Sequence, residues 1–261
     1  MLGKLLKYDF KSMFRVFVPL WLALLAVSVI NHFTTRMTPN DNALGGLPQV
    51  VFMILYVGMI IAVMVVSIAL IIMRFYHGLL KDEGYLMFTL PVKPWQLVSS
   101  KCIAATVVAI LSLAAAVLSV LLIAADASFV PDLFRDLRQV LPHITGEMVL
   151  ALVLVVVLII AAVMAEITHV YASLALGHLA NRHRIAWAVL VYIVINAVLS
   201  ALMVVFANLA DRYHWRIDLP QGDQVAVLNC VLGILILVCV VQIAVFFVAT
   251  ERILSKRLNL E

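Results

Sequence analysis

Six long apolar stretches alternate with short polar segments along the chain. They lie between Arg15 and Arg36, Asp41 and Arg74, Lys101 and Asp126, Glu147 and Arg182, Arg184 and Asp211, and Asp223 and Glu251, and Glu166 is the one Asp, Glu, Lys or Arg inside them. Each reaches the roughly 20 residues with which a helix crosses a hydrocarbon layer about 30 Å thick. A helix also satisfies its own backbone polar groups there. The pattern predicts an all-α integral membrane protein with six transmembrane helices, roughly at residues 16–35, 48–73, 102–125, 148–170, 185–210 and 225–250.

Two shorter segments combine apolar residues at helical spacing with charged residues between them. Before the first span, Lys4, Lys7, Asp9 and Lys11 separate Leu2, Leu5, Leu6, Met13 and Phe14. This segment is typical of an interfacial helix that leads into a span. After the third span, Pro131 precedes Leu133, Phe134, Leu137, Val140 and Leu141, with charged residues among them. Proline near a helix start and this spacing predict a short amphipathic helix on the outer surface.

The composition excludes a soluble protein. The chain is 66% apolar and 12% charged, whereas soluble domains are about 45–50% apolar and 25% charged. The spans take more than half of the 261 residues, so no loop is long enough for a nucleotide-binding or catalytic domain of ordinary size. We therefore expect a single transmembrane domain over residues 1–261.

The distribution of basic residues predicts the orientation. With the N-terminus inside, 13 of the 18 Lys and Arg residues fall on the inner side, and Arg36, Arg135, Arg138, Arg212 and Arg216 fall outside. Because loops rich in Lys and Arg stay in the cytosol, both termini are predicted to be cytosolic. The pI of about 9.1 then reflects a basic face against anionic lipid heads, and no nucleic-acid partner is expected.

The inner connection between spans two and three, residues 74–101, is the most unusual segment. We expect span two to continue as a helix through Lys81, Gly84 to end that helix, and Pro94 to open the next one. Between them, an apolar elbow is flanked by charge: Tyr85, Leu86, Met87, Phe88, Leu90 and Pro91 lie between Lys81, Asp82, Glu83 and Lys93. Such an elbow suits the groove of a partner protein. It equally suits a re-entrant segment that dips into the membrane interface.

The connection between spans four and five, from Gly177 to Arg184, is short and basic. It is either a second contact point for a soluble partner or an anchor of the positive-inside type, and the residues alone favour the anchor.

Glu166 and His169 form the one strongly ionisable cluster within a span. Three residues apart, they share a helix face and could pair, relay a proton or bind a cation. Glu166 also lies 19 residues after Glu147, about 28 Å along the helix, and hence near the inner membrane surface. There it could simply be hydrated or hydrogen-bonded to a neighbouring helix, which is the interpretation that the position favours. Since the spans contain no second such pair, we predict no metal site.

Three segments resemble bacterial ABC-transporter permeases of the type-2 exporter class. They are RFYHGLLKDEGYLMFTLPVKPWQLVSSK from Arg74, YASLALGHLANRHRIAWAVLVYIVI from Tyr171, and ERILSKRLNLE from Glu251. The resemblance implies a six-helix subunit of the bacterial plasma membrane that pairs as a homodimer or heterodimer with a second permease subunit and binds separate soluble ABC ATPase subunits. It implies that the ATPase is engaged by the loop between spans two and three, through Lys81, Asp82, Glu83, Gly84, Tyr85, Leu86, Phe88 and Pro91.

The chain contains no G-x-x-x-x-G-K-[ST] loop to hold nucleotide phosphates. We therefore expect no ATP hydrolysis and no cofactor in this chain, with ATP and Mg²⁺ on the partner ATPase. The expected function is ATP-driven export of an amphipathic or hydrophobic substrate. An alternative is a stand-alone secondary transporter or channel, for which repeats and several midplane charges would be expected. A third hypothesis, an intramembrane enzyme using Glu166 and His169, requires another polar group at the same depth.

Overall fold

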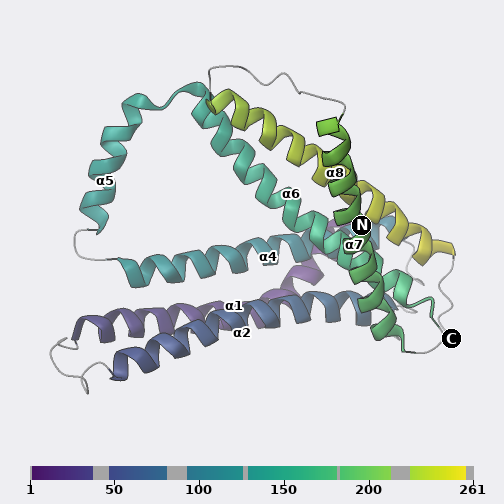
Figure 1. Ribbon diagram of the computed structural model, residues 1–261. Helices are drawn as coiled ribbons and strands as arrows, with labels where there is room; N and C mark the ends of the chain where they lie inside the picture. Colours follow the sequence, from purple (N-terminus) through teal and green to yellow (C-terminus); the bar gives the residue numbers. More distant parts are fainter. Residues whose placement is uncertain are drawn as a thin grey trace. The chain divides into compact units, whose positions relative to one another are not determined.

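The computed structural model describes residues 2–37, 47–80, 93–125, 129–180, 183–212 and 224–256, and every regular element in them is a helix (Figure 1). In chain order these are α1 (Leu2–Met37), α2 (Leu47–Phe75), the π-helical turn η1 (Tyr76–Leu80), α4 (Pro94–Ala124), α5 (Phe129–Val140), the 3-10 turn η2 (Leu141–His143), α6 (Gly146–Gly177), α7 (Arg184–Arg212) and α8 (Gln224–Lys256).

Six of these helices are long and apolar enough to cross a membrane. They are found at Leu2–Thr34, Val50–Leu80, Pro94–Ala124, Gly146–Gly177, Arg184–Val205 and Gln224–Ser255. The predicted fold class, an all-α protein with six transmembrane helices, is thereby confirmed. Helix α2 continues through η1 to Leu80, and α4 begins at Pro94, as the sequence predicts for both sides of the inner connection.

The two amphipathic segments are also helical. The N-terminal segment joins the first span without a break, so that α1 has 36 residues and is about 54 Å long. A hydrocarbon layer is only about 30 Å thick, so the charged first turns of α1 extend beyond it. The segment around Pro131 forms α5, in which Asp132 and Arg135 make a 2.8 Å ion pair.

The chain divides into two compact units. The first contains residues 1–73 and 103–144, and the second contains residues 74–102 and 145–261. The division cuts through α2 and α4, so η1 and the first turns of α4 belong with α6, α7 and α8.

In the first unit, α1, α2 and α4 pack through apolar side chains. Leu24, Tyr56 and Val63 form its buried cluster, and Ile123 of α4 packs against them. Polar side chains inside these helices bond to neighbouring helices: the Tyr56 hydroxyl pairs with Ser119 Oγ at 2.9 Å, and Trp21 Nε1 donates to Ser112 Oγ at 3.0 Å. In a membrane the lipid tails are as apolar as the side chains, so the hydrophobic effect does not drive helices together. Hydrogen bonds of this kind therefore help to hold spans together.

In the second unit, α6 packs along both α7 and α8. Where α6 ends, a Cβ added to Gly177 would lie 2.4 Å from the backbone of Ala188 on α7, so the two backbones cross in direct contact. Small residues allow this approach between membrane helices. On the same end of α6, the ring of Tyr171 stacks on Phe75 of α2 with centroids 3.8 Å apart, and both side chains are fully buried.

The ends of α6 follow from local sequence. Thr145 caps its start by accepting a 3.4 Å hydrogen bond from the Met148 amide, and Glu147 lies in the first turn. A hydroxyl cap and an early carboxylate both stabilise a helix N-terminus. At the other end, His183 adopts a left-handed backbone with φ of 53°, and α7 begins at the next residue.

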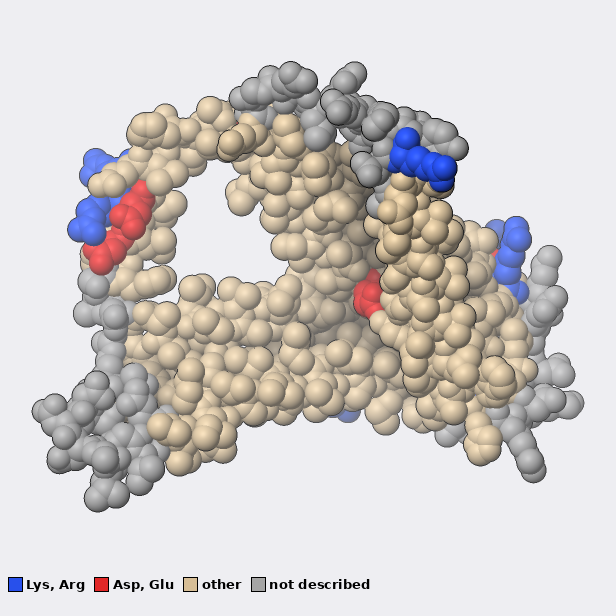
Figure 2. All heavy atoms as spheres, viewed as in Figure 1, with Lys and Arg blue, Asp and Glu red and all other residues tan. Residues whose placement is uncertain are grey.

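Charge is sparse on the described surface. Figure 2 shows helix flanks that are almost entirely uncharged, with the Lys and Arg residues gathered toward helix ends. Large apolar side chains are exposed along the spans, from Val50 in α2 to Val248 in α8. Such a surface requires lipid around it.

Candidate functional site

Glu166 lies on an exposed face of α6, 11 residues before the helix ends at Gly177. That separation places it about 16 Å from the end of the helix. The hydroxyl of Tyr192 on α7 donates a hydrogen bond to Glu166 Oε1. A carboxylate inside a span therefore has a hydrogen-bond partner on the neighbouring helix.

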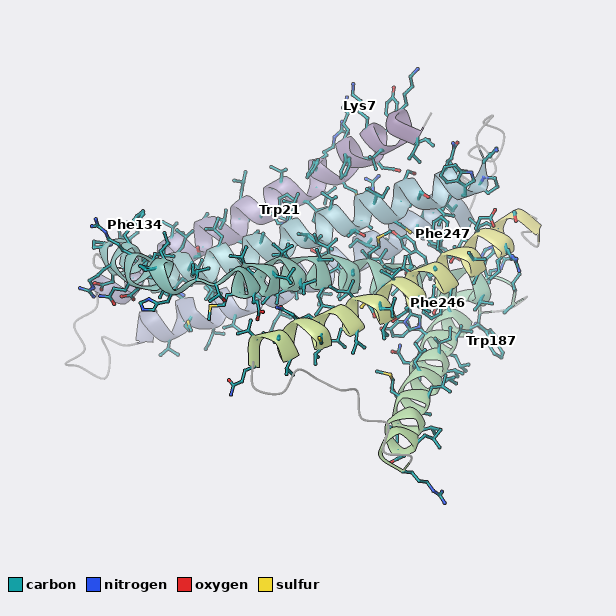
Figure 3. The ribbon with its side chains drawn as sticks, turned by 90° about the horizontal axis from the view of Figure 1, so that it is seen from above. Lys7, Trp21, Phe134, Trp187, Phe246 and Phe247 are labelled. Carbon is teal, nitrogen blue, oxygen red and sulfur yellow. The ribbon has the colours of Figure 1, made fainter. Side chains whose placement is uncertain are left out.

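His169 is held between two aromatic rings. Its imidazole stacks on Tyr192 of α7 and on Phe246 of α8, with ring centroids 4.7 Å apart in both cases. The side chain is 1% exposed, and its Nε2 has no hydrogen-bond partner among the described residues. Figure 3 shows Phe246 on α8. Three helices thus meet around one buried ring.

The predicted pair does not form a direct contact of its own. Glu166 bonds to Tyr192, and in the described part of the chain no hydrogen bond or ion pair joins it to His169. Tyr192 connects the two residues, since its hydroxyl meets the carboxylate and its ring covers the imidazole. The cluster therefore holds three polar groups, Glu166, Tyr192 and His169. The Phe246 ring stacks on His169.

Tyr192 and Phe246 are the members of the cluster that the sequence did not indicate. Tyr192 had a detectable signal, because it stands four residues before Asn196 in an otherwise apolar span, and polar residues one turn apart share a helix face. The Asn196 side chain donates to the Tyr192 carbonyl at 3.1 Å. Phe246 had no signal, since α8 is rich in apolar residues on every face.

A metal site does not arise from this cluster. Among the described residues, no group of three or more His, Cys, Asp and Glu side chains is placed to hold a metal ion. Glu166 and His169 supply two such groups, and the third member of the cluster is a phenol.

The predicted ATPase-coupling residues lie outside the described residues. These are Lys81, Asp82, Glu83, Gly84, Tyr85, Leu86, Phe88 and Pro91. The helix ends on both sides of them are described: η1 is buried from Gly78 to Leu80, and α4 is buried at Leu97 and Val98, after an exposed Trp95. Leu79 and Leu80 of η1 are at most 2% exposed, and Leu97 and Val98 of α4 are 1% exposed. The Lys101 side chain lies 3.5 Å from the Cβ position of Gly78, which places η1 against α4.

The second inner connection contacts the same region. His178, which follows α6, meets Tyr76 of η1 edge to face, with ring centroids 6.1 Å apart. Arg184 Nη1 donates to His178 Nε2 at 3.2 Å. Burial and the adjacent Arg184 charge lower the pKa of His178, and a neutral ring is the form that accepts this bond at Nε2. Asn181 and Arg182, within this connection, lie outside the described residues.

Comparison with protein-family models, with curated proteins and with solved structures gives no match to this chain. The resemblance to ABC permeases therefore depends on the residues quoted for it, and function is argued from the two regions described above.

Proposed function

We propose that this chain is the membrane-spanning permease subunit of an ATP-driven ABC exporter in the bacterial plasma membrane. It moves an amphipathic or hydrophobic substrate outward, and a separate soluble ATPase drives it through the loop between α2 and α4. A second permease subunit, identical or different, completes the transporter. Both termini and the loop face the cytosol in this proposal.

The observation that carries the proposal is the buried setting of the two helix ends around residues 81–92. On one side, η1 packs with Leu79 and Leu80 fully buried, and on the other side α4 buries Leu97 and Val98. Packed interiors transmit displacement because they have little free volume. A force applied to this loop would reach both helices directly.

Contacts of η1 and of the last residue of α2 extend this connection to α6. Tyr76 contacts His178 at the start of the α6–α7 turn, and Phe75 stacks on Tyr171 of α6. A π-helical turn is uncommon and frequently marks a functional segment. Closure of an ATPase pair beneath the loop would bias the helices between two arrangements, which is how ligand-driven transitions generally act.

Photocrosslinking from the elbow tests this function. We would replace Leu86 with p-benzoylphenylalanine, irradiate native membranes that contain the full chain, and identify the adducts by mass spectrometry. The expected adduct is a soluble protein that carries the G-x-x-x-x-G-K-[ST] sequence. A matched control places the same probe at Phe134 of α5, which is 68% exposed and predicted to lie outside, and should give no such adduct.

Two results would overturn the proposal. One is an elbow probe that reaches only lipid, which would make the segment a re-entrant element. The other is transport by the purified chain in liposomes without an ATPase, which would establish the stand-alone transporter or channel instead.

A further inference from the structure

We propose that Glu166 binds the cationic group of an amphipathic cargo, so that the substrate class of this permease is a monovalent organic cation with an apolar body. The substrate role rests on the transport function proposed above. The site consists of Glu166 on α6 and Tyr192 on α7, with His169 and Phe246 packed behind the Tyr192 ring.

Glu166 has unused capacity for hydrogen bonds. An ionised carboxylate has two oxygens with about four acceptor positions, and the Tyr192 hydroxyl occupies one of them. Because the residue is exposed on the face of α6, its second oxygen is accessible from outside the helix. A carboxylate in contact with lipid is costly unless a positive charge or a proton compensates it.

Among the described residues, the Glu166 carboxylate accepts from Tyr192 and no Lys or Arg forms an ion pair with it, although Arg74 and Lys101 lie within the spans of α2 and α4. The central apolar stretches of all six spans lack Lys and Arg. The basic residue that precedes Tyr192 on its own helix is Arg184, eight residues away and about 12 Å along the axis, and it donates to His178.

Two buried rings pack behind Tyr192 and restrict the position of its side chain. His169 is 1% exposed between the rings of Tyr192 and Phe246, and Phe246 is itself buried on α8 (Figure 3). The unpartnered His169 Nε2 adds a second polar atom that this unit leaves without a hydrogen bond. The Tyr192 hydroxyl is thereby held at the carboxylate rather than free to rotate into lipid.

The surroundings select an organic cation over an inorganic one. Hard metal ions such as Ca²⁺ require about six or more oxygen ligands, whereas the described residues hold no group that could bind a metal. The face of α6 that carries Glu166 continues with Ala162 and Ile159, which are exposed one and two turns away. If the ammonium group of a ligand binds Glu166, the apolar chain of the same ligand can lie along this surface.

Binding to the full chain in lipid nanodiscs tests this site. The probe is mono-dansylated 1,8-diaminooctane, whose second amine is a free ammonium group, and the form acetylated at that amine serves as the neutral comparison. We expect Glu166→Gln to weaken binding of the ammonium probe about tenfold or more, because a charge-assisted bond is lost, and to leave the neutral probe unchanged. Tyr192→Phe should weaken binding of the ammonium probe about threefold, since the carboxylate remains but loses its orientation.

Glu147→Gln is the matched control, because it removes a carboxylate from the first turn of the same helix and should change neither probe. Far-UV circular dichroism like that of the unaltered chain, and a cooperative thermal transition well above the assay temperature, would exclude misfolding of each variant as the cause. The inference is overturned if Glu166→Gln binds both probes as the unaltered chain does, or if crosslinking at position 166 yields only a Lys or Arg of a different permease subunit. Either result leaves the ATPase adduct at Leu86 unaffected, so failure of the site is distinguishable from failure of the proposed function.

Discussion

His169 and His178 stand nine residues apart on one helix and its C-terminal cap, and both are buried, yet their surroundings differ. At the end of the span, His178 accepts a hydrogen bond from Arg184 and contacts Tyr76. Within the span, His169 has aromatic rings on both faces. Each ring has one buried nitrogen without a partner among the described residues, Nε2 of His169 and Nδ1 of His178, but only His178 is bonded to a charged side chain there. A charged side chain costs little free energy near a helix end, where water and loops are close. The interior of a bundle offers mainly apolar side chains, and a charge there is costly.

The difference separates two kinds of region in the second unit. Around His178, the described polar contacts run between elements of this chain and hold η1, α6 and α7 together. Around His169, the polar contacts end at Glu166, which faces outward with capacity for another partner. We propose that the first region transmits movement and that the second receives a ligand. Three substitutions and a change of pH would each alter one contact that makes these regions different.

Gly177→Ala should have the largest effect, because it breaks the α6–α7 crossing that both regions share. The new Cβ would lie 2.4 Å from the Ala188 backbone, which cannot move aside as a flexible side chain would. Ala188 is one turn before Tyr192, so separating the helices also moves Tyr192 away from Glu166. We expect a loss of about 3 kcal/mol in unfolding free energy, measured by thermal unfolding in detergent.

Gly233→Ala provides the matched control for this change. Gly233 lies inside α8, and a Cβ there meets nothing within 4 Å, so alanine should be neutral or stabilise the helix by about 0.5–1 kcal/mol. Equal melting temperatures for the two variants would show that α6 and α7 do not cross in contact at Gly177.

The helices could be predicted from the sequence because the length of an apolar run is enough to indicate a membrane-spanning helix. Runs of at least 20 residues with at most one Asp, Glu, Lys or Arg, between Arg15 and Glu251, specify where helices lie, and Pro94 correctly marks the start of α4. The contact between Glu166 and Tyr192 could not be predicted in the same way. A helix that is apolar on all sides gives no periodicity from which to infer the face it turns toward a neighbour.

The same reasoning applies to the crossing at Gly177. Glycine is common in membrane spans, so its presence in α6 does not specify which helix approaches it. The contact with Ala188 also depends on the connection between α6 and α7, in which His183 has a left-handed backbone, and the residue types there do not specify this geometry. The coupling role of residues 81–91 stays a prediction, since they lie outside the described residues.

Tyr192→Phe should have an intermediate effect, because it removes one hydrogen bond and keeps both ring stacks. We expect a loss of about 1 kcal/mol, within the range measured for hydrogen bonds between membrane helices. Tyr56→Phe in the first unit is the comparison. Its partner Ser119 also donates to the Ala116 carbonyl at 2.7 Å and so keeps a bond, whereas Glu166 would lose its one described partner. A larger loss of stability for Tyr56→Phe than for Tyr192→Phe would contradict the conclusion that Tyr192 is the one described hydrogen-bond partner of Glu166.

Acidification should have the smallest effect, and it acts on His178. Burial and the charge of Arg184 lower the pKa of this residue in the folded protein, while the unfolded chain keeps a value near 6.5. The unfolded state therefore binds the proton more readily, and stability that is complete above about pH 6.5 declines as the pH falls from there through the lower folded pKa. Arg184 and Tyr76 are the charged and titratable groups in described contact with the ring. Melting temperatures at pH 8 and pH 5.5 would measure the decline, and His178→Gln, which can still accept from Arg184 through its amide oxygen, should reduce it. An unchanged pH dependence in that variant would assign the effect to another group and remove the distinction between the two histidines.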